Sequence, residues 1–149
     1  PRNRHDQPIK AAEAEKSALS RRGRGLSTPN PNVGCLIVQD GRGVGRGWTQ
    51  KGGRPHAEAQ ALEQAMDRAR GATAYVTLEP CAMCAAAISA ARVARLYYGA
   101  SDPKSGGVAQ GARVFSHAQC HHAPDVYDAI AAPESEDLLK AFFAEKRKG

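Results

Sequence analysis

Long hydrophobic runs are missing from this chain of 149 residues. Its longest apolar stretches are short and broken by charged residues, which argues against a membrane-spanning helix. The first residues, PRNRHD, are polar and do not form the apolar centre of a secretory signal. We therefore expect a cytoplasmic protein that makes no contact with a membrane.

Cysteine is also scarce, with 4 residues in the chain. Four thiols without an export signal argue against a disulfide framework. Cys81 and Cys84 have the C-x-x-C spacing that is typical of metal ligands. Cys35 falls within a predicted strand, and we interpret it as a small core side chain.

The overall composition is that of an ordinary globular protein, with 42% hydrophobic and 24% charged residues. No repeat or low-complexity linker divides the chain, so we expect a single domain over 1–149, with flexible ends at 1–8 and 146–149. The net charge of +6 is compatible with an anionic substrate or RNA but requires neither.

The hydrophobic pattern alternates between helical and extended segments. Helices are predicted over 10–22, over 55–70, from 80 and from 133, and strands over 33–38, 44–49, 73–78, 93–98 and, weakly, 126–130. Asp40 and Gly41 give a two-residue hairpin signal between the first two strands. The helix from 80 joins two strands that should be parallel with a right-handed crossover. Together these elements predict an α/β fold, a three-layer α/β/α sandwich with a mixed sheet of about five strands.

Two short motifs carry the chemistry, His56-Ala57-Glu58 and Pro80-Cys81-Ala82-Met83-Cys84. Each stands near the start of a predicted helix, where the helix dipole favours a thiolate. Glu58 lies four residues before Leu62 on the apolar side of its helix, so its carboxylate should face the core. Burying a carboxylate without a partner is costly, and this position therefore indicates a function.

His56, Cys81 and Cys84 supply the three ligands of a catalytic zinc site, which keeps its fourth position for water. Glu58 is then the catalytic residue that moves protons. The H-x-E…P-C-x-x-C pattern is the signature of the zinc deaminases. A redox C-x-x-C pair, or a closed zinc site completed by Cys35 or by the cluster Cys120-His121-His122, are the alternatives.

With these motifs the chain resembles the cytidine deaminase superfamily, and the resemblance extends over nearly the whole chain. Different segments resemble two different families within it. The segments similar to the riboflavin-pathway pyrimidine deaminase are TPNPNVGC at 28–35, GRGW at 45–48, GRPHAE at 53–58 and GATAYVTLEPC at 71–81. The segments similar to the bacterial tRNA adenosine deaminase are GASDPKSGG at 99–107 and LLKAFF at 138–143. The chain lacks the longer loop that the riboflavin enzymes carry between their cysteine ligands.

The zinc motif predicts one catalytic Zn²⁺ per chain, and the resemblance implies a homodimer. The candidate substrate-binding residues are Asn30, Trp48 and Thr49. Asn30 is implied to face the heterocycle, although an Asn between two prolines is also a common turn residue. Thr49 stands where the tRNA enzymes usually have a base-reading Asn. Trp48 either walls the pocket or packs in the core. His117 and the cluster Cys120-His121-His122 form a polar loop near the pocket mouth or a second metal site.

The function expected from these residues is hydrolytic deamination of an exocyclic amine on a nucleobase-like ring, leaving a carbonyl and ammonia. We favour a small pyrimidine- or purine-type base or nucleoside as the substrate. The alternative within this class is a tRNA-specific adenosine-to-inosine deaminase. A different class of protein, a non-catalytic zinc-stabilised nucleic-acid-binding module, would surround the metal with four protein ligands.

Overall fold

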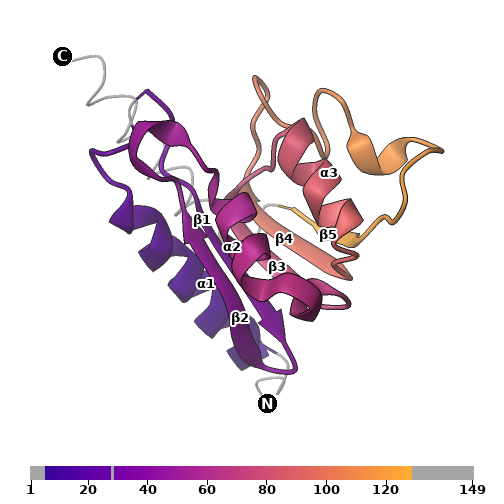
Figure 1. Ribbon diagram of the computed structural model, residues 1–149, viewed down its shortest axis with the longest axis horizontal. Coiled ribbons are helices and arrows are strands. Elements are labelled where there is room, and N and C mark those ends of the chain that lie inside the picture. Colours follow the sequence, from indigo (N-terminus) through magenta and orange to yellow (C-terminus); the bar gives the residue numbers. More distant parts are fainter. Residues whose placement is uncertain (1–5, 28, 129–149) are drawn as a thin grey trace.

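The computed structural model describes residues 6–27 and 29–128, which form a five-stranded sheet covered by helices (Figure 1). The strands are β1 Gly34–Gln39, β2 Arg42–Trp48, β3 Thr73–Leu78, β4 Arg95–Ala100 and β5 Asp125–Tyr127, in the order β2-β1-β3-β4-β5. Strand β1 is antiparallel to both of its neighbours, whereas β3, β4 and β5 are parallel. The predicted mixed sheet is confirmed, and so is the parallel β3-α3-β4 unit.

The helices cover the two faces of the sheet, as the three-layer prediction requires. Helix α1 (Asp6–Arg22) packs on one face, where Leu36 and Tyr75 belong to its apolar cluster. Helices α2 (Ala57–Ala65) and α3 (Ala82–Ala90) pack on the other face (Figure 1). Neighbouring residues of a strand therefore point into different clusters, and β1 is buried on both faces.

A tight hairpin joins β1 to β2 at the predicted position. Asp40 and Gly41 both have positive φ, 51° and 75°, as a two-residue type I′ turn demands. The return strand then follows directly from Arg42 and pairs along β1, with a register shift between Ile37 and Val38.

Helices α2 and α3 both begin later than the prolines predicted to open them. The residue that caps the N-terminus of α2 is His56, and that of α3 is Cys81, both with extended backbone. The prediction that α2 runs to residue 70 was also wrong, because Met66 takes a positive φ of 53° and the chain continues as a 3₁₀ turn. Met66 is 75% exposed and is not part of the apolar stripe.

Helix α2 lies unusually close to β2 because that strand presents glycines to it. A Cβ added at Gly45 would lie 2.2 Å from the carbonyl oxygen of Ala61. One added at Gly47 would lie 2.1 Å from the carbonyl oxygen of Ala57. The alternating glycines are thus hairpin residues with a packing role, and they leave room for the backbone of α2.

Two glutamines of α2 reach over the outer side of β2, which is an edge strand of the sheet. Gln60 Oε1 accepts a hydrogen bond from the backbone N–H of Trp48 at 3.0 Å. Gln64 Oε1 accepts one from the backbone N–H of Arg46 at 2.7 Å. Outward-facing donors of the edge strand are therefore paired with side chains of the helix.

None of the helices in the described part of the chain combines the length and apolar character that a membrane crossing needs. The helix predicted from residue 133 and the end of the weak strand near residue 130 lie outside the described residues. Of the flexible ends predicted at 1–8 and 146–149, residues 1–5 and 146–149 also lie outside them.

Candidate active site

The N-terminal ends of α2 and α3 bring the two sequence motifs together. His56 and Cys81 stand directly before their helices, and Cys84 lies in the first turn of α3. One donor atom from each of the three residues lies within 4.8 Å of the others. His56 Nδ1 is 3.7 Å from Cys81 Sγ and 3.4 Å from Cys84 Sγ. Two sulfurs and one imidazole nitrogen are donors that Zn²⁺ prefers, so these residues fit the metal that the sequence predicts.

The two thiols are electrostatically unequal. Hydrogen bonding from the Cys84 thiol lowers the pKa of Cys81 to about 5, and the backbone N–H of Cys84 and the neighbouring His56 act in the same direction. The shared hydrogen bond and burial both raise the pKa of Cys84 above its ordinary value. Without a metal, Cys81 therefore carries the thiolate of the pair.

Glu58 stands in the first turn of α2 with only 5% of its surface exposed. Its inward orientation confirms the prediction made from the helical pattern. Burial raises the pKa of the carboxyl group, and the Cys81 charge acts in the same direction, while a hydrogen bond from its own backbone N–H partly opposes the shift. A buried carboxyl group beside three metal donors is placed to hold and release a proton.

A cavity of about 280 Å³ opens beside these four residues. It is lined by Asn30, Pro31, Val33, Thr49, Gly53, Arg54, His56, Glu58, Leu78, Glu79, Cys81, Asp102 and Ser105. The lining comes from three loops, from the start of α2 and from the carboxyl end of β3, where ligands of open α/β sheets usually bind.

The three predicted substrate residues have different environments. Asn30 lines the cavity, and its side-chain amide has no hydrogen-bond partner among the described residues. It packs over Gly53, where an added Cβ would lie 1.9 Å from Asn30 Nδ2. Thr49 also borders the cavity, but its hydroxyl oxygen already accepts the backbone N–H of Val33 at 2.8 Å.

Trp48 does not line the cavity. It packs against the apolar cluster under α1, and the Arg22 guanidinium carbon lies 5.1 Å from its ring centroid. Strand alternation explains this placement, because Trp48 and Thr49 are adjacent residues and point to opposite faces. Of the two readings of Trp48, packing in the core is therefore the one that agrees with the structure.

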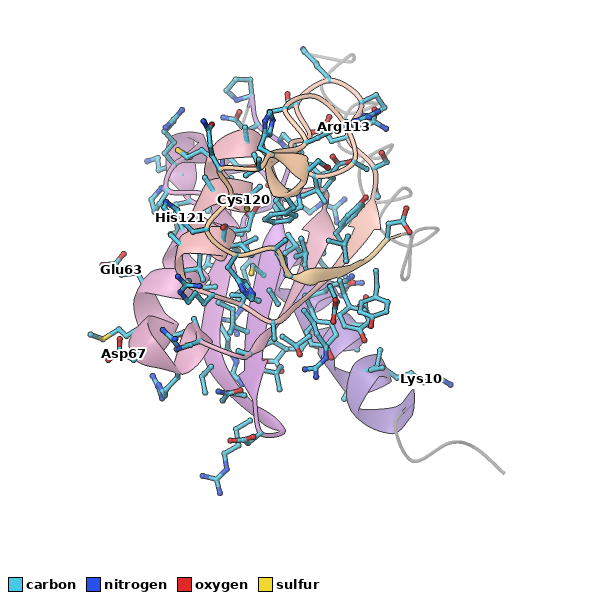
Figure 2. All side chains as sticks on the ribbon, turned by 90° about the vertical axis from the view of Figure 1, so that its right-hand side faces the viewer. Lys10, Glu63, Asp67, Arg113, Cys120 and His121 are labelled. Atoms are coloured by element: carbon cyan, nitrogen blue, oxygen red, sulfur yellow. The ribbon has the colours of Figure 1, made fainter. Side chains whose placement is uncertain are left out.

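The histidine- and cysteine-rich segment after residue 116 lies away from the cavity, which corrects the prediction of a loop near its mouth. Ser89 Oγ donates to the carbonyl oxygen of His122 at 2.6 Å and lies 3.3 Å from Cys120 Sγ. His122 Nε2 lies 2.9 Å from the carbonyl oxygen of Val93. These contacts hold Cys120 and His122 at the C-terminal end of α3, the end remote from Cys81 (Figure 2 labels Cys120 and His121).

Glu79 is a site residue that the sequence analysis missed. It is only 2% exposed, lines the cavity and accepts hydrogen bonds from the loop at 101–110. Its position at the carboxyl end of a parallel strand, next to the metal motif, was the signal that could have identified it.

Comparisons with known proteins find similar deaminases. The family model described as "Cytidine and deoxycytidylate deaminase zinc-binding region" matches residues 9–100. The chain is 49% identical over 124 residues to the tRNA-specific adenosine deaminase of Agrobacterium fabrum, covering 77% of this chain and 82% of that protein. It is 43% identical over 137 residues to the riboflavin biosynthesis protein RibD of Escherichia coli, covering 88% of this chain but 36% of RibD.

A solved structure of RibD from Acinetobacter baumannii superposes with a TM-score of 0.78 at 36% identity. The match covers 91% of this chain and 39% of the RibD chain. This chain therefore spans little more than a third of the RibD proteins that it resembles.

Proposed function

The chain belongs to the cytidine and deoxycytidylate deaminase zinc-binding family and is a zinc-binding deaminase, and from this premise we propose its substrate class. The proposed substrate is a small nucleobase-like heterocycle of the pyrimidine or purine type, as free base or nucleoside. Hydrolysis replaces the exocyclic amine of the ring with a carbonyl group and releases ammonia.

We assign His56, Cys81 and Cys84 as the ligands that hold Zn²⁺. When bound, Zn²⁺ supplies a Lewis acid that lowers the pKa of water toward neutrality. Glu58 carries the protons of the reaction. It accepts one proton from the attacking water and passes it to the ring nitrogen next to the amine. It then takes the second proton of that water, from the hydroxyl group now on the ring, and delivers it to the departing amine as the carbonyl forms. Water supplies the carbonyl oxygen and ammonia leaves, so the atoms balance.

The placement of Glu58 is the observation that carries this proposal. Burying an unpaired carboxylate costs folding free energy, so its presence here indicates a function. Burial also raises the pKa of the carboxyl group, so that it can hold a proton nearer to neutral pH. A closed structural zinc site gives no reason for such a residue. We therefore set aside the reading of the chain as a non-catalytic zinc-stabilised module.

The cavity supports a small substrate. Its volume of about 280 Å³ lies just below the range of about 300–1,000 Å³ that is usual for small-ligand pockets. Asn30 offers both an amide donor and an amide acceptor to a ring edge, and within the described chain its side chain has no other partner. We propose Asn30 as the residue that reads the heterocycle, with Thr49 as part of the wall.

A panel assay for released ammonia tests the substrate class. The zinc-loaded chain is incubated with pyrimidine and purine bases, their nucleosides and nucleotides, and an anticodon stem-loop that contains adenosine. Release from a free base or nucleoside supports the proposal. Release from the stem-loop alone would overturn it in favour of the second candidate.

Adenosine in tRNA is that second candidate, and the extent of one match favours it. The chain covers 82% of the Agrobacterium tRNA deaminase but 36% of the Escherichia coli RibD protein. The net charge of +6 would suit a polyanionic partner.

We also propose that the chain forms a homodimer and functions in the cytoplasm. An exposed stripe of small and apolar residues on α3, formed by Ala82, Met83, Ala86 and Ala90, supports self-association. Four free cysteines are typical of a reducing compartment.

A further inference from the structure

We propose that Glu79 is a positioning residue of the deaminase site. Its carboxylate ties the loop at 101–110 to the strand end that leads into α3. It thereby sets the cavity wall formed by Asp102 and Ser105.

Both oxygens of Glu79 are fully engaged with this one loop. Oε1 accepts from Ser101 Oγ at 3.1 Å and from the backbone N–H of Asp102 at 3.3 Å. Oε2 accepts three successive backbone N–H groups, those of Val108, Ala109 and Gln110, at 3.2, 3.1 and 3.0 Å. Successive N–H groups that converge on one oxygen form an anion-binding nest, so the loop is built around this carboxylate.

The loop also meets the metal-binding segment through its backbone. The N–H of Gly107 donates to the carbonyl oxygen of Pro80 at 2.8 Å, and Gly106 forms an isolated bridge with the metal ligand Cys81. A Cβ at Gly106 would lie 2.3 Å from Glu79 Oε2, and one at Gly107 would lie 2.4 Å from the backbone nitrogen of Ala82. Because Gly106 and Gly107 have no side chain, the loop can approach both the Glu79 carboxylate and the start of α3 closely.

The two cavity-lining residues of the loop lie in the turn that the two groups of hydrogen bonds anchor. Asp102 follows Ser101 at one end, and Ser105 precedes the nest at the other end. Asp102 Oδ1 accepts the backbone N–H groups of Lys104 and Ser105 at 3.2 and 3.0 Å, which fixes the turn between them. Loss of the Glu79 acceptors would release both ends of the turn and move this wall.

This role differs from that of Glu58. Both carboxylate oxygens of Glu79 accept hydrogen bonds from the loop, so neither oxygen is free to carry protons to a substrate. Its effect should therefore appear in substrate binding more than in the chemical step.

The substitution Glu79→Gln tests the proposal, because glutamine keeps the size of the side chain but turns an NH₂ group toward N–H donors. Glu63→Gln is the matched control, since Glu63 is an exposed carboxylate on α2 that points away from the protein (Figure 2). Three quantities are measured for each variant: zinc content, hydrogen exchange of the amides at 108–110, and kcat and KM for the compound from the ammonia panel that reacts fastest.

We expect the Glu79→Gln variant to keep its zinc. Its amides at 108–110 should exchange at least about tenfold faster, and KM should rise by about tenfold or more with a smaller change in kcat. The control should match the unsubstituted chain. Unchanged exchange and unchanged KM would overturn the proposal, and so would a loss of activity that only follows a loss of zinc.

Ser101→Ala is a second variant in case Glu79→Gln does not fold. It removes one donor to Glu79 from an exposed residue, and it should move exchange and KM in the same direction by a smaller factor. No movement in either quantity would count against the proposal. The exchange measurement needs no substrate, so its result is separate from the choice of heterocycle.

Discussion

The substitution Gly47→Ala should displace the start of helix α2, which carries Glu58, although it changes no residue of the site itself. A Cβ at this position would lie 2.1 Å from the carbonyl oxygen of Ala57, although real Cβ atoms essentially never approach another atom closer than 3.0 Å. Ala57 stands between His56 and Glu58, and the obstructing atom is backbone, so the start of α2 must move as a whole. The smallest movement that relieves the clash is about 1 Å.

The expected cost follows from this distance. Overpacking of this kind lowers the free energy of unfolding by about 1–3 kcal/mol. A misplacement of about 1 Å in a catalytic constellation costs about 100-fold in rate. We therefore expect kcat/KM to fall by about two orders of magnitude, beyond what the loss of folded protein explains.

Gly43→Ala is the control, because Gly43 lies on the same strand but beyond the register shift, where an added Cβ would not meet α2. Its added Cβ would meet only the guanidinium group of Arg46, a flexible and partly exposed side chain that can move. Urea unfolding, zinc content and kcat/KM are measured for both variants. Equal activity and equal stability of the two variants would refute the conclusion that the spacing between β2 and α2 sets the site.

Three further outcomes are expected. Glu58→Gln should lower the rate of deamination by about 10²–10⁴-fold while zinc content stays the same, and a fully active variant would refute its role as the proton carrier. After chelation of the metal, Cys81 should react with iodoacetamide at a rate that changes little between about pH 6 and pH 8, because its pKa of about 5 keeps it in the thiolate form above that value; a rate rising about tenfold per pH unit would contradict this. Met83→Glu places a charge on the exposed stripe of α3 and should shift a dimer toward monomer in light scattering, whereas an unchanged mass would remove this face as the interface.

Much of the sheet and the metal site could be predicted from the sequence because their signals are local. Continuous apolar runs mark β1 and β3, and the turn at Asp40 requires residues that accept positive φ. The convergence of His56 with the two cysteines was predictable because each motif stands at the start of a helix that comes just after a strand or a loop.

The features that could not be predicted depend on contacts between distant segments. Glu79 binds mostly backbone N–H groups of a loop more than 20 residues away, and backbone donors leave no trace in the residue types. The side of the sheet on which Trp48 lies depends on strand register, which its composition does not give. The end of α2 depends on the backbone of Met66, and methionine is an uncommon residue at positive φ.

The two glutamines that cover β2 protect this edge strand against aggregation. An uncovered edge strand offers free N–H and C=O groups to any extended chain, and such pairing starts aggregation. Gln60 and Gln64 occupy the N–H groups of Trp48 and Arg46 with side chains of the helix that begins beside His56. If α2 came loose after loss of its metal, the same movement would uncover these donors. Metal loss and a tendency to aggregate should therefore be coupled in this protein through one helix.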